Sequence, residues 1–550
     1  MANLCNIHKG EKASCFPVRL TCTHTQHSSS SSSSCSICLR VEELNRGVVE
    51  TKRAQDGAVE QLGVFLEQVN RQYDPLQRLP VELAISIFLY LPRPPSLDVF
   101  DVTFTAKKHH ALRPVPFILG SVCRYWRRIV WSTPQFWNVL WLYVRACGPI
   151  GRSRILREWL DRSGQLALYI CMFLPNNIAD EHQLPSDMDR STTWESIDDM
   201  IDTVNHYIHR MKVLHLSLAG PQINRFGHKL VQVARTEDSN PTLERLSIVL
   251  EPLIERGWAP KSYQFKLGGR TESPTHVSFR NINAWNVHIH WGNVIYLEAS
   301  QMSIRSALEL LRLAPQMQHF KFIVLPYLDR DKGDPSHVTH HSLTSLTCES
   351  DDDSGTFLSL ITCPALEKLS YRCELCNIPT FLERSACGLK DLTLDTFACV
   401  DDKTGSLLAI FHLTPLLTRL SFSRCTDLFG KFSGFLARHH FNLRQFLPHL
   451  LFLHVSSSPT HFQHFNWSRI SSAIYRDYPN EKVDPHPISQ VEVIFGEAVV
   501  DPSKNGSYVI DRKSLLQIME LVQEDRVEIE IKDREGLDLI ALSRKFHNLD

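Results

Sequence analysis

Long hydrophobic runs are missing from this 550-residue sequence. No segment approaches the roughly 18 apolar residues that a membrane-spanning helix needs. Near the start, Lys9, Glu11 and Lys12 interrupt what would be the apolar core of a signal peptide. An excess of charge is missing as well, because 59 basic residues balance 60 acidic ones, which argues against nucleic acid as a partner. We expect an intracellular protein of the cytoplasm, the nucleus or both, with no membrane partner.

Motifs of catalysis are also absent. The sequence has no phosphate-binding loop, no glycine-rich dinucleotide motif, no HExxH zinc motif and no GxSxG nucleophile elbow. No other pattern places a nucleophile beside a base. The sequence therefore predicts a protein that is not an enzyme and has no cofactor.

Cysteine occurs fifteen times but forms no dense framework. Several cysteines, such as Cys123, lie within apolar segments, which predicts buried and reduced thiols. Near the amino end, Cys5 with His8 and Cys35 with Cys38 have the spacing of zinc ligands. A run of seven serines lies between these pairs, however. A zinc-binding protein is therefore an alternative hypothesis, and the favoured prediction has no metal site.

The first 38 residues are polar and are predicted to be disordered, because they cannot bury enough apolar area to offset the entropy of ordering. Residues 39–75 instead predict one helix with the heptad spacing of a coiled coil, although glycines and two polar positions weaken it. This seam consists of Val41, Leu44, Val48, Thr51, Gln55, Ala58, Leu62, Phe65 and Val69. Such a helix either self-associates, or folds back on the chain or leads into the next segment.

Two stretches further on predict amphipathic helices whose apolar faces are too rich for so small a unit to bury alone. The first stretch covers residues 79–91, where Pro80 and Glu82 suit a helix start. The second covers residues 122–141, in which Thr133 and Pro134 predict the start of a further helix. Part of each apolar face is therefore expected to meet a partner.

These two stretches resemble the two halves of the F-box, and the segment STPQFW at residues 132–137 is similar to one found in large fungal F-box proteins. The resemblance implies a substrate receptor of an SCF-type ubiquitin ligase, with a Skp-like adaptor and a cullin-based ligase core as partners. Ubiquitin transfer would then belong to other subunits. By position, the resemblance implies adaptor contacts at Leu79, Pro80, Leu83, Ile87, Phe88, Leu91, Val122, Cys123 and Trp126.

The 25-residue linker from Pro92 to Pro116 is longer than the usual F-box connection. As an exposed loop it would leave the docking face intact, since lengthening such a loop costs only a few tenths of a kcal/mol. Alternatively, the F-box is degenerate and the chain is a leucine-rich scaffold without a ligase role. A third interpretation is that both helices are ordinary core of an α-helical domain.

A leucine pattern recurs beyond about residue 200, and its clearest copies are PTLERLSI, PQMQHFKF and PALEKLSY. From Met317 onward, the first apolar positions are spaced 26, 23, 23, 28 and 33 residues apart. Most of these intervals match the period of about 20 to 29 residues of leucine-rich repeats, in which each unit supplies one parallel strand and a returning helix. The pattern favours an irregular leucine-rich solenoid over an irregular α/β domain with chance spacing.

In such a strand the leucines point inward, and the residues between them are expected to line one concave surface. This candidate substrate-binding surface consists of Glu244, Arg245, Gln318, His319, Glu367, Lys368, Lys390, Asp391, Thr418 and Arg419. Its mixed charges imply a protein partner that is recognised by complementary patches.

The predicted fold class is α/β, with an N-terminal helix and a small three-helix F-box followed by an irregular leucine-rich-repeat solenoid. The predicted organisation is a disordered tail at 1–38, the helix at 39–75, the F-box at 76–141 with its internal loop at 92–116, the solenoid at 142–490, and a capping strand, helix and strand at 491–550.

Overall fold

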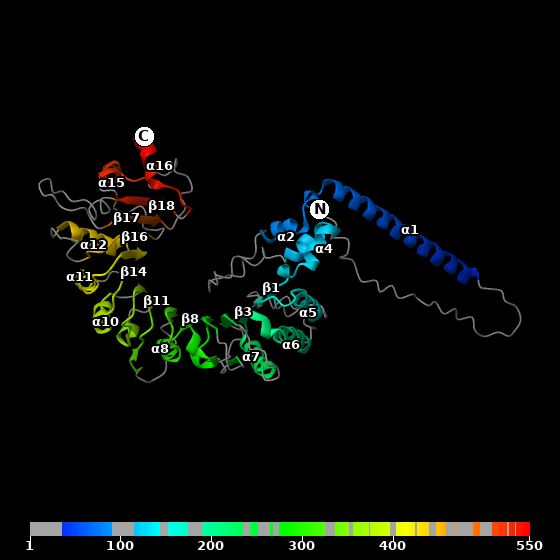
Figure 1. Ribbon diagram of the computed structural model, residues 1–550, viewed down its shortest axis with the longest axis horizontal. Helices are drawn as coiled ribbons and strands as arrows, with labels where there is room; N and C mark the ends of the chain where they lie inside the picture. The colour runs from blue at the N-terminus through cyan, green and yellow to red at the C-terminus, as the bar shows by residue number, and fades with distance from the viewer. Residues whose placement is uncertain are drawn as a thin grey trace.

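A computed structural model provides the structure of the protein. It describes residues 36–90, 115–143, 152–173, 190–234, 243–250, 264–267, 274–324, 336–350, 356–372, 375–395, 403–423, 426–438, 447–457, 467, 488–495, 509–524, 527–533 and 535–549. The fold is mixed α/β with a large parallel sheet, as predicted. The elements follow an arc, with strands on its inner side and helices on its outer side (Figure 1).

Among the described residues the main sheet has fourteen strands, which follow chain order and pair in parallel with their neighbours. In order they are β1 (Val139–Tyr143), β2 (Leu168–Phe173), β3 (Met211–Leu218), β4 (Arg245–Leu250), β6 (His276–Arg280), β8 (Tyr296–Met302), β9 (His319–Val324), β11 (Ser345–Ser350), β13 (Lys368–Arg372), β14 (Asp391–Asp395), β15 (Arg419–Ser423), β16 (Phe452–Ser457), β17 (Gln490–Phe495) and β18 (Glu528–Asp533). Two short side sheets pair β5 (Phe265–Lys266) with β7 (Val287–His288), and β10 (Val338–Thr339) with β12 (Ile361–Thr362).

Helices on the outer side connect most of these strands. They are α5 (Arg152–Arg162), α6 (Arg190–His206), α7 (Gly220–Ala234), α8 (Ile304–Leu313), α9 (Thr356–Ser359), α10 (Asn377–Ser385), α11 (Lys403–Leu413), α12 (Thr426–Arg438), α15 (Arg512–Glu524) and α16 (Leu539–Phe546). Because a parallel connection must return to the same end of the sheet, each returning segment lies over the strands it joins.

Strand register explains the recurring leucines. Leu346, Leu369 and Leu392 lie side by side on β11, β13 and β14, and all three are fully buried. Alternate residues of a strand point to opposite faces, so one face of every strand is apolar and packs beneath the outer helices. The first apolar residue of each predicted repeat, such as Met317 and Leu417, is buried as well.

The N-terminal part consists of the long helix α1 (Ser36–Tyr73) and a small helical module. The module contains the 3-10 turn η1 (Pro75–Arg78), the helices α2 (Val81–Tyr90), α3 (Val115–Val122) and α4 (Arg124–Ser132), and the 3-10 turn η3 (Pro134–Phe136). We call residues 74–137 the helical module. It joins the amino end of the sheet, and α1 projects away from it (Figure 1).

Two local predictions about this module were wrong. The second apolar stretch was expected as one continuous helix through Val122 and Trp126, but the chain breaks at Cys123, which has extended backbone angles and caps α4. The helix expected to begin at Pro134 is a single 3-10 turn, and Val139 already belongs to β1. The hydroxyl of Thr133 does not cap that turn; it donates to the carbonyl of Ile129 at 2.7 Å.

The C-terminal segment continues the sheet. Residues 491–550 were expected to cap the exposed edge of the last repeat, and the predicted strand, helix and strand are present as β17, α15 and β18. However, β17 pairs with β16 and β18 with β17 in the same parallel register as the other strands. The sheet therefore continues through this segment, because Val491, Val493, Ile529 and Ile531 extend its apolar columns.

Candidate interaction surfaces

Asp74 organises the helical module from its first residue. One carboxylate oxygen accepts the backbone N–H of Leu76 at 3.0 Å and so caps η1. The other accepts the indole N–H of Trp126 at 2.7 Å. A single carboxylate therefore ties the end of α1 to α4, 52 residues further along the chain.

A close contact between α3 and α4 fixes their crossing. A Cβ atom added at Gly120 would lie 2.1 Å from the indole ring of Trp131, so only glycine fits at this position. The guanidinium of Arg127 also donates to the carbonyl of Gly120 at 2.7 Å. These contacts hold α3 against α4 without using the outward-facing apolar residues of α3.

Aromatic rings join the helical module to the first units of the sheet. The ring centroid of Trp137 lies 5.2 Å from that of Trp131 and 4.9 Å from that of Trp159 in α5. The ring centroid of Phe117 lies 5.5 Å from that of Trp159. The guanidinium of Arg162 lies over the rings of Trp131 and Trp137. Because these rings pack edge to face across the junction, the module is attached to the sheet by a buried contact.

Four of the nine predicted adaptor contacts lie on the surface. The exposed fractions of Leu83, Ile87 and Val122 are 52, 44 and 55%, and Pro80 is exposed as well. Leu79, Cys123 and Trp126 are half-buried. Leu91 and the predicted loop up to residue 114 lie outside the described residues.

Phe88 is a correction to the predicted set. Its side chain is only 2% exposed, and its ring centroid lies 4.7 Å from that of Trp126 and 6.5 Å from that of Phe136. It belongs to the core of the module, because it follows the buried Ala84 by four residues and so lies on the same, inner side of α2. Phe88 shapes the surface but does not form it.

The helical module has further exposed apolar residues that sequence reasoning missed. Val81 and Tyr90 on α2, and Phe117 and Ile118 on α3, are exposed large hydrophobic side chains. Ile118 precedes Val122 by four residues, so both lie on one side of α3, and this spacing was the available signal. Val81 lies on another side of α2, and Phe117 packs on Trp159. We therefore call the exposed side chains Leu83, Ile87, Tyr90, Ile118 and Val122 the apolar docking face.

The second candidate surface is the inner face of the sheet. All ten predicted residues are exposed or half-buried, but they divide into two groups. Arg245, His319, Lys368, Asp391 and Arg419 begin their strands and point to the inner face. The other five, Glu244, Gln318, Glu367, Lys390 and Thr418, each precede a strand and lie at the sheet edge where the strands begin.

Sequence reasoning missed the next two rows of the inner face. The residues two and four positions after each strand start point the same way, because side chains alternate with period two. The second row includes Ser247, Ser278, Glu298, Lys321 and His454. The signal was available, since each of these residues stands between the two buried apolar residues of its strand.

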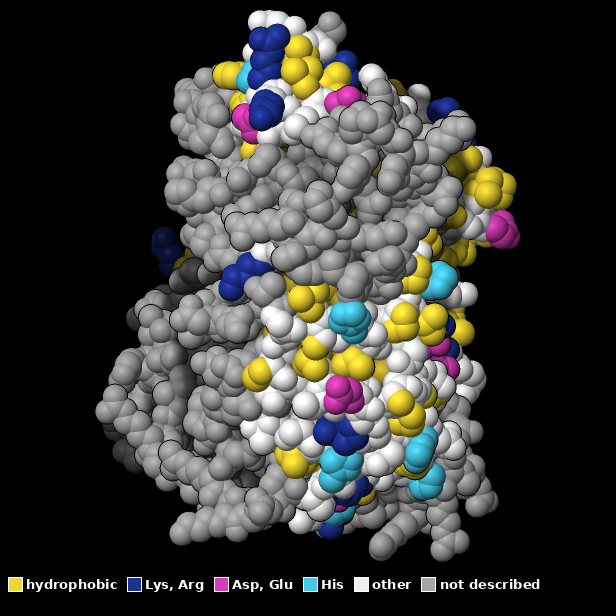
Figure 2. All heavy atoms as spheres, turned by 90° about the vertical axis from the view of Figure 1, so that its left-hand side faces the viewer, with side chains coloured by type: hydrophobic (Ala, Val, Ile, Leu, Met, Phe, Trp, Pro, Cys, Tyr) yellow, Lys and Arg dark blue, Asp and Glu magenta, His cyan; other side chains and the backbone are white. Residues whose placement is uncertain are grey.

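Charges on the inner face are matched between neighbouring strands. Ion pairs join Lys321 to Glu298 at 2.8 Å, Lys368 to Asp391 at 3.2 Å, and Arg372 to Glu349 at 3.3 Å. Burial opposes the charge of Lys321, but the hydrogen bond to Glu298 and its negative charge outweigh burial and raise the pKa of Lys321. Figure 2 shows the left-hand side of the arc and not its inner face; there too, basic, acidic and histidine side chains are intermingled.

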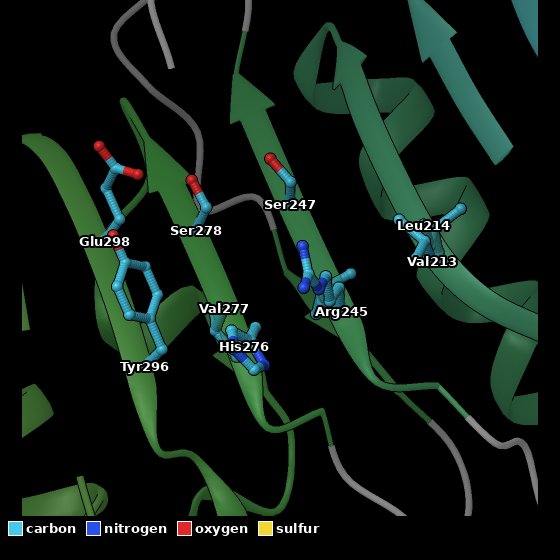
Figure 3. A pocket seen from close by; sticks show the side chains of 10 residues that line it. Val213, Leu214, Arg245, Ser247, His276, Val277, Ser278, Tyr296 and Glu298 are labelled. Carbon is cyan, nitrogen blue, oxygen red and sulfur yellow. The ribbon is translucent and has the colours of Figure 1, made fainter. Parts of the chain in front are cut away.

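A shallow hollow of about 290 Å³ lies on the inner face over β3, β4, β6 and β8. Arg245, Ser247, His276, Ser278, Tyr296 and Glu298 project from successive strands around it (Figure 3). Burial, together with the charge of Arg245, lowers the pKa of His276, and burial and Glu298 raise the pKa of Tyr296. At neutral pH both rings are uncharged, and the rings of His276 and Tyr296 stack at 5.7 Å.

The hollow offers donors and acceptors but no catalytic pair. Arg245 and Tyr296 can donate hydrogen bonds and Glu298 can accept them, while the hydroxyl of Ser278 is buried with no hydrogen-bond partner among the described residues. None of the residues lining it is a nucleophile hydrogen-bonded to a base. The arrangement is suited to binding a polar segment of another molecule.

The paired cysteines and histidines and the long helices bear on metal binding and on membrane crossing. Within the described ranges, no group of three His, Cys, Asp or Glu side chains is placed to hold a metal ion. Cys5, His8 and Cys35 of the proposed zinc pairs lie outside those ranges, as does the side chain of Cys38. Of the helices that the structure describes, none combines the length and the apolar character needed to cross a bilayer.

Comparison with known proteins adds no relative to these observations. No model of a known protein family matches the chain, and no curated protein matches it.

Proposed function

We propose that the protein is a substrate-recognition subunit of an SCF-type ubiquitin ligase. In this proposal the helical module is an F-box that binds a Skp-like adaptor, and the curved sheet is a leucine-rich-repeat solenoid that binds a protein substrate. The observation that carries the proposal is the apolar docking face, where Leu83, Ile87 and Val122 remain exposed although their module has a complete aromatic core. Several exposed apolar side chains on one small module are typical of protein interaction sites.

The roles of the module residues follow from their positions. Leu83, Ile87, Ile118 and Val122 would supply buried contact area in the complex, since each can lose most of its exposed surface on binding. Phe88 and Trp126 would hold α2 against α4 and keep that surface in shape. The Asp74 carboxylate would act in the same way by accepting the Trp126 indole N–H.

The sheet would supply substrate binding. Its inner face presents rows of polar side chains from successive strands, and Arg245, His319, Lys368, Asp391 and Arg419 begin five of those strands. Complementary charge across such a face gives specificity and register more than raw affinity. The protein itself would contribute no bond-making chemistry; it would raise the local concentration of a substrate lysine near the ubiquitin-carrying enzyme.

Binding of purified full-length protein to an immobilised Skp-like adaptor tests the proposal. The variant Leu83→Glu plus Ile87→Glu places two charges on the apolar docking face while keeping helix-forming residues. We expect at least a tenfold weaker affinity, because two desolvated contacts would be replaced by charges. Melting temperature should not change by more than about 2 °C, since surface substitutions usually change stability little.

The matched control is Leu416→Glu plus Leu451→Glu. These two leucines are about equally exposed but lie just before β15 and β16, far along the chain from the module. The control should bind the adaptor like the wild type. If the wild type does not bind the adaptor at micromolar concentrations, or if both variants bind it equally well, the ligase proposal fails and a leucine-rich scaffold becomes the better interpretation.

A further inference from the structure

We propose that α1 forms a two-stranded, parallel coiled coil with α1 of a second copy of this chain. The proposal concerns the seam positions Leu44, Val48, Thr51, Gln55, Ala58, Leu62, Phe65 and Val69. It goes beyond the proposed ligase function and does not depend on it, because it rests on a helix outside the helical module.

The seam is uncovered in the structure. The exposed fractions of Leu44, Val48, Leu62 and Phe65 are 66, 66, 57 and 60%, and of the eight seam residues only Val69 is half-buried. A single exposed leucine needs no explanation, but four large apolar side chains on one side of one helix indicate a covering partner. The helix therefore does not fold back on any described part of the chain.

An isolated helix of this composition would be weak. Gly47, Gly57 and Gly63 each lower helix stability by roughly 1 kcal/mol relative to alanine. A Cβ atom added at Gly47 or Gly57 would have no neighbour within 4 Å, so no contact within the chain compensates for them. Most helix stability in proteins comes from packing of an apolar face, and for α1 this packing has to come from another molecule.

The helical module leaves the seam accessible. The contact between α1 and α4 is at Gly63, where an added Cβ atom would lie 3.5 Å from the guanidinium of Arg124. Gly63 directly follows the seam residue Leu62 and is turned about 100° away from it around the helix axis. Leu62 and Phe65 consequently remain exposed beside the module. Two helices can pair along the seam without displacing α2, α3 or α4.

The pattern of residues identifies the partner as a second copy. The seam alternates in steps of three and four, which is a period of 3.5 and requires a second helix that winds around the first. β-Branched Val48 at position a and Leu44 at position d favour two strands. The polar residues Thr51 and Gln55 are adjacent in the seam, and in register they would meet their own copies and disfavour shifted pairings.

Charge and area are compatible with self-pairing. The sequence of α1 contains five basic and six acidic residues, so two copies carry little net charge and do not repel each other strongly. Pairing along four heptads would bury on the order of 1,500 Å², the size of a standard stable interface.

The seam residues and the flanking positions are compatible with the parallel orientation. In a parallel pair, Lys52 at position e faces Gly47 of the second copy, and Arg40 at position g faces Asn45 of the second copy. In the antiparallel register that pairs all eight seam positions, Thr51 would face Leu62 and Gln55 would face Ala58 of the second copy. Only the parallel, in-register arrangement lets the polar residues Thr51 and Gln55 meet their own copies.

Light scattering after size-exclusion chromatography of the full-length protein at about 50 µM tests the pairing. We expect the wild type to have twice the 63.1 kDa mass of the chain. The seam variant Leu44→Glu plus Leu62→Glu should have the mass of one chain. The matched control Val49→Glu plus Val64→Glu changes two exposed valines outside the seam and should keep the double mass.

Three results would overturn the proposal. They are a monomeric wild type, a seam variant that remains dimeric, and a control variant that dissociates as readily as the seam variant. A monomeric wild type would mean that a foreign helix or another ligand covers the seam. None of these results bears on adaptor binding, which is measured separately with the variants of the apolar docking face.

Oxidative cross-linking tests the orientation. In a parallel pair, the variant Val48→Cys brings two position a thiols together, so mild oxidation should yield a covalent dimer beyond the wild-type level. The control Val49→Cys, one residue out of the seam, should not. In an antiparallel pair that uses the whole seam, Val48 faces Phe65 of the second copy. A dimeric Val48→Cys variant that forms no extra cross-link would therefore overturn the parallel arrangement.

Discussion

The sheet and the N-terminal helices use the same apolar residues at regular spacing with opposite results. In the sheet, Leu346, Leu369 and Leu392 are fully buried because each strand is covered by its neighbours and by an outer helix. In α1 and α2, Leu44 and Leu83 are more than half exposed. The same kind of side chain therefore stabilises the fold in one region and is available for binding in the other. The difference lies in whether the chain supplies its own cover.

The largest expected effect is in the sheet. Leu392→Ala removes a fully buried side chain from the middle of an apolar column and should lower the free energy of unfolding by about 2–5 kcal/mol. Leu83→Ala on the apolar docking face should change it by no more than about 0.5 kcal/mol. Chemical denaturation of both variants measures the contrast, and equal losses would contradict the division into a self-covered and an uncovered region.

The next largest effect on stability is expected at a glycine of the helical module. Gly120→Ala forces a methyl group against the Trp131 ring, which itself packs on Phe117 and Trp137. We expect a loss of about 1–3 kcal/mol, because overpacking shifts rings that have no free space. Thermal unfolding gives the measurement. An unchanged melting temperature would show that α3 and α4 are less tightly joined than the structure indicates.

A pH effect is expected in the sheet region. Burial lowers the pKa of His340. The hydrogen bond between its ring nitrogen Nε2 and the Ala314 carbonyl, at 3.0 Å, opposes this shift, but Nδ1 is buried with no partner among the described residues. The unfolded chain therefore binds a proton more readily than the folded one, so stability should fall as pH drops below the ordinary histidine value of about 6.5.

The variant His340→Gln isolates this contribution. Glutamine can still donate a hydrogen bond to the Ala314 carbonyl but does not titrate. The decrease in melting temperature between pH 7 and pH 5 should be smaller in the variant than in the wild type. The same decrease in both proteins would show that His340 has no part in it.

The smallest expected effect is a gain in the uncovered region. Gly57→Ala in α1 adds a methyl group that meets nothing within 4 Å, and it should stabilise the helix by about 0.5–1 kcal/mol. The circular dichroism signal of helix at 222 nm should become stronger. The proposed dimer should be more stable and should dissociate only at a lower protein concentration. A loss of helicity would indicate that a partner occupies this side of α1.

Much of the architecture was predictable because it depends on local pattern. The leucine spacing identified the strands around Met317, Leu366 and Leu417, and the heptad spacing identified α1 almost to its ends at Ser36 and Tyr73. The end of a helical run was harder to predict. The break at Cys123 occurs where Gly120 packs on Trp131, and the 3-10 turn at Pro134 occurs just before Val139 joins the sheet beside Tyr169. Both contacts are between separate elements, so a local sequence pattern does not reveal them.

The candidate surfaces were predictable in part. The pattern of α2 identified Leu83 and Ile87 correctly as surface residues, but it could not separate them from Phe88, whose side chain is directed to Trp126 and Phe136. On the sheet, the pattern identified the strand starts, such as Lys368, but assigned the preceding residue, Glu367, to the same face. Period-two alternation decides the face, and it begins only where the strand itself begins.

By itself, the sequence determined the fold class, the strand order and the buried columns, because in a repeated parallel unit each element contacts only its sequence neighbours. Tertiary structure alone decided which apolar residues are left uncovered. Exposure of Leu83 and Val122, and burial of Phe88, result from the packing of α2, α3 and α4 around one aromatic core. Exposure depends on what the rest of the chain places over a residue, and no local pattern contains that information.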